Sequence, residues 1–217
     1  MFVAEGPREV ERALAAGLRA TAIYYSPELL PGWEHGGDEV SARVLAKMSY
    51  RTEPEGVLAV FETPERAMPE NATLVLVAVG IEKPGNLGAL ARSADAAGAD
   101  ALVIAEAEAD AWNPNAIRAS TGAVFTLPVV EATLHDVRAL PLQNVAAVLG
   151  ASTSHTDADL TKPTALVIGA EDDGLPQHWR DAADLEVAIP MHAQAVDSLN
   201  ASTAAAVLLF EAVRQRG

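Results

Sequence analysis

The sequence contains no cysteine and only five histidines. Without cysteine there is no disulfide, no thiol nucleophile and no thiolate ligand for a metal, which fits a cytoplasmic protein. The histidines form no HxxxH or HxH pair, so we expect no zinc site and no other bound metal. No apolar run reaches about 18 residues, and charges begin at Glu5, so we expect neither a membrane span nor a signal peptide.

Basic residues are also scarce. Fifteen Lys and Arg stand against thirty Asp and Glu, which gives a net charge of −15. Residues 1–70 hold 7 bases and 12 acids (net −5), and residues 71–217 hold 8 and 18 (net −10). Nucleic-acid-binding proteins usually display a basic surface, so this balance counts against a polyanionic partner. Net charge governs solubility and long-range steering, however, and a local basic cluster can still bind phosphate.

The first 70 residues alternate helix and strand signals. The amphipathic run Arg8–Ala16 predicts a helix, and the apolar run Thr21–Tyr25 predicts a strand. We expect a second helix, capped by Asp38 and continuing through Ser49, and then a buried strand over 56–61. The following residues are rich in proline and acids and poor in apolar side chains, which indicates a linker. We therefore expect a small α/β domain over residues 1–65 and a linker over residues 66–72.

From Thr73 the alternation becomes more regular. Apolar runs that predict strands or buried segments occupy residues 73–80, 101–105, 124–130, 144–151, 165–170 and 185–190, and helical patterns occupy residues 86–97, 134–140, 177–183 and 198–216. Nearly continuous apolar strands that alternate with helices are typical of a parallel sheet covered on both faces. Residues 73–217 are therefore expected to form one α/β domain.

Three segments of this domain carry chemistry. In the first, Gly85–Arg92, a strand leads into a helix and the loop lies where ligands bind in open α/β sheets. Asn86 is expected to cap the helix, so that the backbone amides of the first helical turn face an anion. Arg92 lies nearly two turns further along, and its planar guanidinium group can bind phosphate. The alternative interpretation is a capped helix with a solvated arginine. GNLGAL lacks the GxGxxG spacing of a dinucleotide site, and the sequence contains no Walker A motif.

The second segment, Gly169–Gly174, follows an apolar strand. Gly169 permits close approach of a ligand to the backbone, and Glu171 is placed to accept hydrogen bonds from a ribose, an amine or an asparagine. The two acids after it are expected to be solvated charges at a helix start. A plain acidic turn is the alternative interpretation.

The third segment combines Ile189, Pro190 and Met191 with Ser198, Leu199 and Asn200 at the start of the C-terminal helix. It supplies apolar walls and polar capping groups. The alternative is that Ser198 acts as an N-cap and nothing more.

The patterns NxGxxxR, GxExxG and IPM…SLN, in this order, resemble the three motifs of the SpoU/TrmH family within the SPOUT class of RNA 2′-O-methyltransferases. The resemblance covers about residues 71–217, including residues 113–125 between the first two motifs. The opening FVAEGPREVERAL is similar to the start of the ribosomal-protein-like RNA-binding domain that often precedes this catalytic domain, although it lacks the usual basic leader.

The resemblance implies an α/β fold with a C-terminal trefoil knot, S-adenosylmethionine as cofactor, a homodimer, and RNA as substrate, with ribosomal RNA favoured over transfer RNA. The residues that match the cofactor-binding positions are Gly169, Ile189, Met191 and Leu199. The residues that match the positions near the reacting ribose are Asn86, Arg92, Glu171, Ser198 and Asn200.

One loop departs from the family pattern. Residues 192–197 lack the glycine that is usual there, which places the affinity for the methyl donor in question. Three other interpretations remain open at this point. They are a catalytically silent SPOUT-fold protein that binds RNA or a partner, a methyltransferase acting on a substrate other than RNA, and a generic nucleotide-binding α/β protein.

Overall fold

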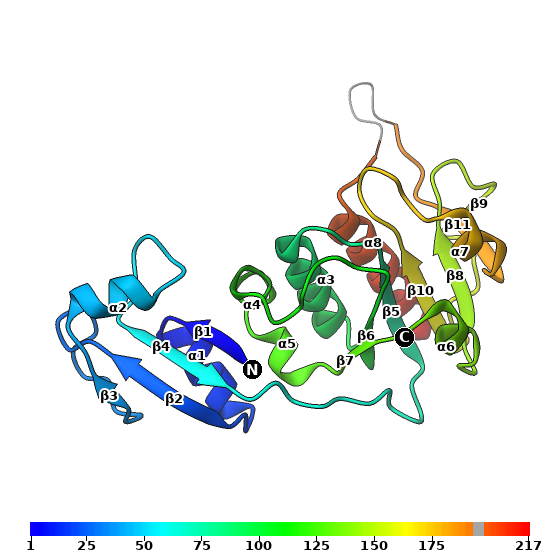
Figure 1. Cartoon of the computed structure of the whole chain (residues 1–217). Coiled ribbons are helices and arrows are strands. Elements are labelled where there is room, and N and C mark those ends of the chain that lie inside the picture. Colours follow the sequence, from blue (N-terminus) through cyan, green and yellow to red (C-terminus); the bar gives the residue numbers. More distant parts are fainter. Residues whose placement is uncertain (193–197) are drawn as a thin grey trace.

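The computed structural model describes residues 1–192 and 198–217 and contains two sheets (Figure 1). The smaller sheet has the strand order β1-β4-β2-β3. Its elements are β1 (Phe2–Glu5), α1 (Pro7–Ala15), β2 (Ala20–Tyr25), β3 (Asp38–Glu39), α2 (Ala42–Met48) and β4 (Val57–Phe61). β4 pairs antiparallel with both β1 and β2, so this part of the chain is a small α/β unit, as the sequence predicts.

The larger sheet has seven strands in the order β7-β6-β5-β10-β8-β11-β9, and every pairing in it is parallel. Its strands are β5 (Leu74–Val79), β6 (Ala101–Ala105), β7 (Val129–Glu131), β8 (Gln143–Ala147), β9 (Thr153–Ser154), β10 (Thr164–Ile168) and β11 (Leu185–Ala188). Every residue of β5, β6 and β10 is buried, because both faces of the sheet are covered. The predicted parallel α/β sheet is therefore confirmed.

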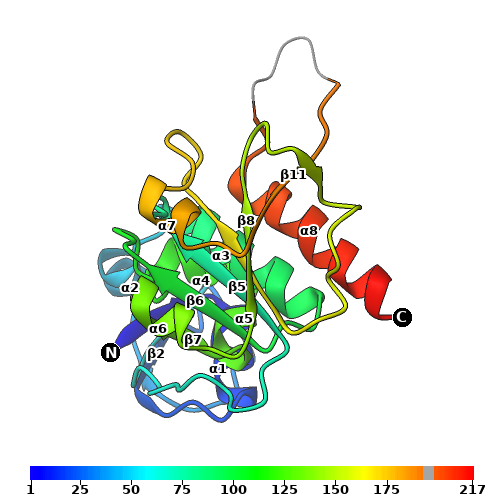
Figure 2. The ribbon, with the colours of Figure 1, turned by 90° about the vertical axis from the view of Figure 1, so that its right-hand side faces the viewer.

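The alternation of side chains along β5 divides the core into two layers. Leu74 and Leu76 belong to a cluster that includes residues of α3 (Pro84–Ala96) and α8 (Ala201–Arg216). Val75 and Val77 point to the opposite face, where α6 (Leu134–Arg138) and α7 (Gln177–Asp181) pack. Figure 2 shows α6 and α7 on one side of the sheet and α8 on the other. The two helices that carry sequence motifs, α3 and α8, thus pack on the same face of the sheet.

The small unit packs against α4 (Pro114–Ser120) and α5 (Ala123–Thr126). The ring of Phe2 lies 4.7 Å from that of Trp112 and 5.8 Å from that of Phe125. Arg66, in the connecting segment, donates a hydrogen bond of 2.9 Å to the carbonyl oxygen of Phe125. One hydrophobic cluster therefore runs through both parts of the chain.

Three helix starts differ from the sequence expectations. Asp38 lies in β3, and α2 is capped instead by Ser41, whose Oγ accepts from the Val44 amide. Helix α3 begins at Pro84, before Asn86, because proline suits the first turn, where its missing N–H costs nothing. The N-cap of α8 is Asn200 rather than Ser198. In addition, the apolar run 124–130 is divided between α5 and β7.

Candidate functional site

The three motifs meet at the carboxyl edge of the larger sheet. The first follows β5, the second follows β10, and the third joins β11 to α8. β5 and β10 are neighbours, and β11 is separated from β10 only by β8. Because the carboxyl ends of parallel strands lie at the same edge, segments far apart in the sequence converge there.

Two motif glycines are required by packing within the chain. A Cβ on Gly169 would lie 2.2 Å from the carbonyl carbon of Gly174, in a turn closed by a 3.1 Å hydrogen bond from the Gly174 amide to the Ala170 carbonyl. A Cβ on Gly88 would lie 2.1 Å from the carbonyl oxygen of Ala116, where α3 crosses α4. Gly169 therefore permits the turn itself, rather than only the approach of a ligand as the sequence suggests.

One polar residue from each motif joins a single cluster. The side-chain amide of Asn200 donates to Glu171 and lies 3.5 Å from Oδ1 of Asn86. Nζ of Lys83 is 3.6 Å from the other carboxylate oxygen of Glu171. We call these four residues the polar cluster. A carboxylate held between a cation and an amide keeps a defined position while it stays 22% exposed to solvent.

The N-cap role of Asn200 sets the orientation of its amide group. Its Oδ1 accepts from the amide and the hydroxyl of Ser202, at 2.9 and 2.6 Å. The amide nitrogen is therefore the atom left to face Glu171 and Asn86. Capping and participation in the polar cluster are thus served by opposite ends of one side chain.

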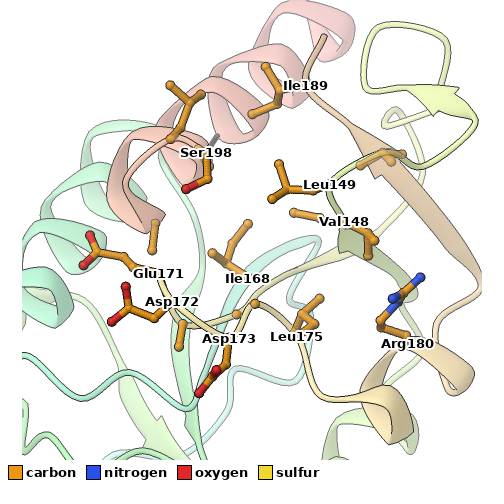
Figure 3. A pocket seen from close by; sticks show the side chains of 18 of the residues that line it. Val148, Leu149, Ile168, Glu171, Asp172, Asp173, Leu175, Arg180, Ile189 and Ser198 are labelled. Atoms are coloured by element: carbon orange, nitrogen blue, oxygen red, sulfur yellow. The ribbon is translucent and has the colours of Figure 1, made fainter. Parts of the chain in front are cut away.

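A cavity of about 260 Å³ lies beside the polar cluster, and we call it the donor cavity (Figure 3). Its lining comes from the ends of β8, β10 and β11 and the residues that follow them, from α7 and from the start of α8. The lining residues are Ala147, Val148, Leu149, Ile168, Gly169, Ala170, Glu171, Asp172, Asp173, Gly174, Leu175, Arg180, Val187, Ile189, Met191, Ser198, Leu199, Ala201 and Ala204. The mixture of apolar walls and a few charged groups suits a small molecule with a flat apolar part and a polar part.

The charged groups occupy opposite ends of the donor cavity. Glu171, Asp172 and Asp173 lie on one side and Arg180 on the other (Figure 3). Arg180 donates through Nε and a terminal nitrogen to the carboxylate of Glu186, at 2.8 and 3.3 Å. The hydrogen bond and the negative charge of Glu186 raise the pKa of Arg180 above its ordinary value. The acidic end is suited to a cationic group of a ligand.

The structure places the four residues expected to bind cofactor, Gly169, Ile189, Met191 and Leu199, in the lining of the donor cavity. Glu171 and Ser198 line it too, and Asn86 and Asn200 reach it through Glu171. Val148, Leu149, Leu175 and Arg180 also line the cavity and are not among the site residues predicted from the sequence. Leu149 had a usable signal, because it follows a parallel strand whose carboxyl end lies at the same edge.

Arg92 does not join the polar cluster. Six residues separate it from Asn86, which places the two side chains about 120° apart around the axis of α3 rather than on the same side. The Arg92 side chain is exposed and has no hydrogen bond or salt bridge with residues 1–192 or 198–217. The glycine-free loop 192–197 lies outside the described residues, apart from His192.

Comparison with known proteins agrees with this geometry. A model of the SpoU rRNA Methylase family matches residues 73–210, and a model of the MRM3-like substrate binding domain matches residues 1–59. A 23S rRNA (uridine(2479)-2′-O)-methyltransferase of Streptomyces viridochromogenes is 39% identical over 230 residues, covering 98% of this chain and 75% of that protein. A 23S rRNA (guanosine-2′-O-)-methyltransferase of Pseudomonas putida is 35% identical, covering 100% of this chain and 88% of that protein.

A solved structure is similar throughout. The SpoU methyltransferase AviRb from Streptomyces viridochromogenes, in complex with the cofactor AdoMet, superposes with a TM-score of 0.86 and 32% identity. The alignment covers 99% of this chain and 90% of that one. The predicted SPOUT-type α/β fold is confirmed. With a family model over most of its length and relatives above one-third identity, this chain belongs to the SpoU rRNA methylase family.

Proposed function

We propose that this protein transfers a methyl group from S-adenosylmethionine to a ribose 2′-hydroxyl of ribosomal RNA. The expected enzyme class, a methyltransferase of RNA, is confirmed by the family to which the chain belongs. The observation that carries the proposal is the contact between the donor cavity and the polar cluster, which share Glu171. A relative that holds AdoMet supports the same cofactor for this cavity.

In this reaction the main task of the protein is to position the ribose relative to the methyl donor. The sulfonium of the donor supplies a reactive methyl group: its S–C bond breaks with the electron pair going to sulfur, and a C–O bond forms to the 2′-oxygen. The chain must hold the ribose in line and accept or relay the hydroxyl proton. We propose that Glu171, held by Asn200 and Lys83, and Asn86 orient the ribose, with Ser198 at the rim of the donor cavity.

We propose an orienting and phosphate-clamping role for Arg92. Its guanidinium, with an ordinary pKa of about 12 or more, is a poor proton acceptor. A planar fork that binds phosphate bidentately suits a side chain on an exposed helix face. The proton leaves to a neighbouring group or to water. No metal is needed, because the donor already carries its leaving group.

The domain organisation that we propose is a substrate-binding domain over residues 1–65, a linker over residues 66–72 and a methyltransferase domain over residues 73–217, with a trefoil knot at its C-terminal end. The MRM3-like match over residues 1–59 supports the first domain. The packing of the residues before and within α8 against the turn after β10 supports a threaded C-terminal segment.

A homodimer is also part of the proposal. The outer face of α8 carries Ala206, Val207, Phe210 and Val213 at helical spacing, with Phe210 50% and Val213 37% exposed. An apolar stripe on a helix surface is typical of a face that packs against another element. Sedimentation of the wild type and of Phe210→Glu would test it, since the charge should shift the mass toward the monomer.

The described residues contain no cluster of three or more potential metal ligands, and none of their helices could span a membrane. Ribosomal RNA is cytoplasmic in bacteria, and we propose that compartment. The relatives named above act on a uridine and on a guanosine, so the proposal names the ribose and leaves the base open.

The experiment that tests the function is transfer of tritiated methyl groups to deproteinised 23S ribosomal RNA. Nuclease digestion to nucleosides should recover the label in a 2′-O-methylated ribose. Calorimetric titration with S-adenosylmethionine should show binding. Donor binding with label transferred only to protein or small molecules would favour a different substrate, and no donor binding would favour a catalytically silent protein.

A further inference from the structure

Cationic side chains are unevenly distributed in this acidic molecule. After residue 130, four of the five basic side chains lie within salt-bridge distance of a carboxylate, in the pairs Arg138–Asp184, Lys162–Asp159, Arg180–Glu186 and Arg214–Glu211. By contrast, Arg43 and Lys47 on α2, Arg92 on α3 and Arg118 on α4 are exposed and have no carboxylate partner within residues 1–192 and 198–217. Arg8 and Arg12 on α1 are also exposed and have no carboxylate partner among these residues, so most of the cations available to a polyanion belong to helices α1 to α4.

An exposed aromatic ring lies near one of these cations, Arg118, where the two domains join. Tyr50, just after α2, is 64% exposed. Its backbone amide donates a 2.5 Å hydrogen bond, and that of Arg51 a 3.2 Å hydrogen bond, to the carboxylate of Glu5, which is itself only 7% exposed. A buried carboxylate with two backbone donors holds the loop, so the ring is presented to solvent at low conformational cost.

The methyltransferase domain completes the arrangement. The Tyr50 hydroxyl accepts a 3.2 Å hydrogen bond from the Asn115 amide, whose Oδ1 accepts a 3.1 Å hydrogen bond from Arg118. Only part of the Arg118 guanidinium is used in this way. Arg51 is not equally available, because it pairs with Glu55 and lies 3.6 Å from Glu9. We call Tyr50, Asn115 and Arg118 the interdomain patch.

The interdomain patch is one helix away from the polar cluster. Helix α4, which carries Asn115 and Arg118, touches α3 at Gly88, two residues after Asn86. Figure 1 shows the loop after α2, helix α4 and the start of α3 along one side of the molecule, with the C-terminal part of the site at the end of that side. A flexible strand bound at the patch would therefore run toward the ribose site.

We propose that the interdomain patch binds single-stranded RNA that flanks the target nucleotide, with a base stacked on Tyr50 and a phosphate on Arg118. This rests on the proposed function and assigns part of substrate recognition to both domains jointly. An aromatic face next to an uncompensated guanidinium is the chemistry that single-stranded RNA recognition uses, because unstacked bases offer a π-face and the backbone offers phosphate. An acidic peptide would use the charge but gain little from the ring.

The test measures the affinity of the full-length protein for a fluorescent single-stranded oligoribonucleotide and for a duplex of the same sequence. Tyr50→Leu should weaken single-strand binding by about fivefold to a hundredfold, the range found for loss of one base stack. Tyr50→Phe keeps the ring and should bind almost as well as the wild type. Arg118→Gln should weaken binding and reduce the slope of log Kd against log salt by about 0.7, as expected for one lost phosphate contact.

Lys162→Gln is the matched control, because it also removes one positive charge but from a pair with Asp159 remote from the patch. It should leave the Kd and the salt slope unchanged. Titration with S-adenosylmethionine and the thermal midpoint of each variant report whether the fold and the donor cavity are intact. If Tyr50→Leu fails to fold, the exposed Arg118 still decides the question.

Unchanged Kd for both Tyr50→Leu and Arg118→Gln would overturn the inference, and so would equal losses for Lys162→Gln. These results would leave the proposed function untouched if the wild type still methylates 23S ribosomal RNA. Conversely, a wild type that binds the oligoribonucleotide through Tyr50 and Arg118 but transfers no methyl group would refute the proposed function and keep the patch.

Discussion

The donor cavity and the polar cluster share Glu171 but are built in different ways. The cavity consists mainly of apolar side chains and of backbone in the tight turn after β10. The cluster consists of charged and amide side chains, with one contribution from each of three distant motifs. Donor affinity should therefore depend on shape, and turnover on individual functional groups. Substitutions that separate these two quantities test that difference.

The largest effect is expected at Arg92, which lies outside the cavity. Arg92→Ala should lower kcat by at least about a hundredfold, the loss expected when a group that positions the substrate is removed, with the affinity for S-adenosylmethionine unchanged. Single-turnover methylation and calorimetry measure the two quantities. Arg92→Lys keeps the charge without the fork and should recover only part of the activity. Near-normal turnover of the alanine variant would remove Arg92 from the mechanism.

Gly169→Ala should affect the shape of the cavity. The added Cβ would lie 2.2 Å from backbone of Gly174, so the turn must move, at a cost of about 1–3 kcal/mol in the free energy of unfolding. We expect a lower thermal midpoint and a loss of donor affinity of about tenfold or more. Gly85→Ala is the control for stability, because that position is helical and open, and alanine should be neutral or stabilising there. Equal midpoints for the two variants would contradict this account of the turn.

Leu149→Ala should weaken the donor without affecting the chemistry. Leu149 lines the cavity and is 67% exposed, and covering it with a ligand would remove its side chain from water. The loss of about 1–2 kcal/mol of apolar burial corresponds to a Kd raised roughly fivefold to thirtyfold, with kcat at saturating donor retained. Leu29→Ala, also at an exposed leucine but in the small domain, should leave both quantities as they are. A drop in kcat at Leu149 would mean that the two regions are not separable.

The smallest effect, a pH dependence of stability, is expected at the far end of α8. Hydrogen bonds from Arg214 and Gln215 lower the pKa of Glu211 from its ordinary 4.5 to about 2. The folded state thus binds fewer protons than the unfolded state, so this carboxylate stabilises the fold above pH 4.5 and the contribution is lost as the pH falls toward 2. Urea midpoints of Glu211→Gln should vary less with pH over this window, with kcat and donor Kd at neutral pH unaltered.

The sequence predicts which residues form the site better than it predicts how these residues are arranged. The order of strands and helices indicates the parallel sheet, and the three motifs identify Asn86, Glu171 and Asn200, which the structure brings together. The prediction of the sheet and of these residues succeeds because buried strands and helix caps leave local sequence patterns. In addition, the carboxyl ends of parallel strands lie at one edge, which brings the motifs together.

The remaining errors have local physical causes. Several residues near the start of a helix can serve as its N-cap. Ser41 rather than Asp38 caps α2, and Asn200 rather than Ser198 caps α8, because the preceding strand or loop ends at a different residue from the one expected. The position of Arg92 follows from its six-residue spacing from Asn86 within α3, which turns the two side chains about 120° apart. The interdomain contacts of Phe2 join segments more than one hundred residues apart. The local periodicity of the sequence does not indicate which distant segments come into contact.

The stacking of Phe2 between the small sheet and the α4–α5 region has a consequence for how the enzyme measures distance. One hydrophobic cluster passes through both domains. The interdomain patch and the donor cavity therefore do not move independently, as they would on domains joined only by a flexible linker. The distance between the interdomain patch and the donor cavity is then fixed by the fold. The nucleotide that is methylated would be chosen by how far it lies from the gripped segment, as well as by its own base.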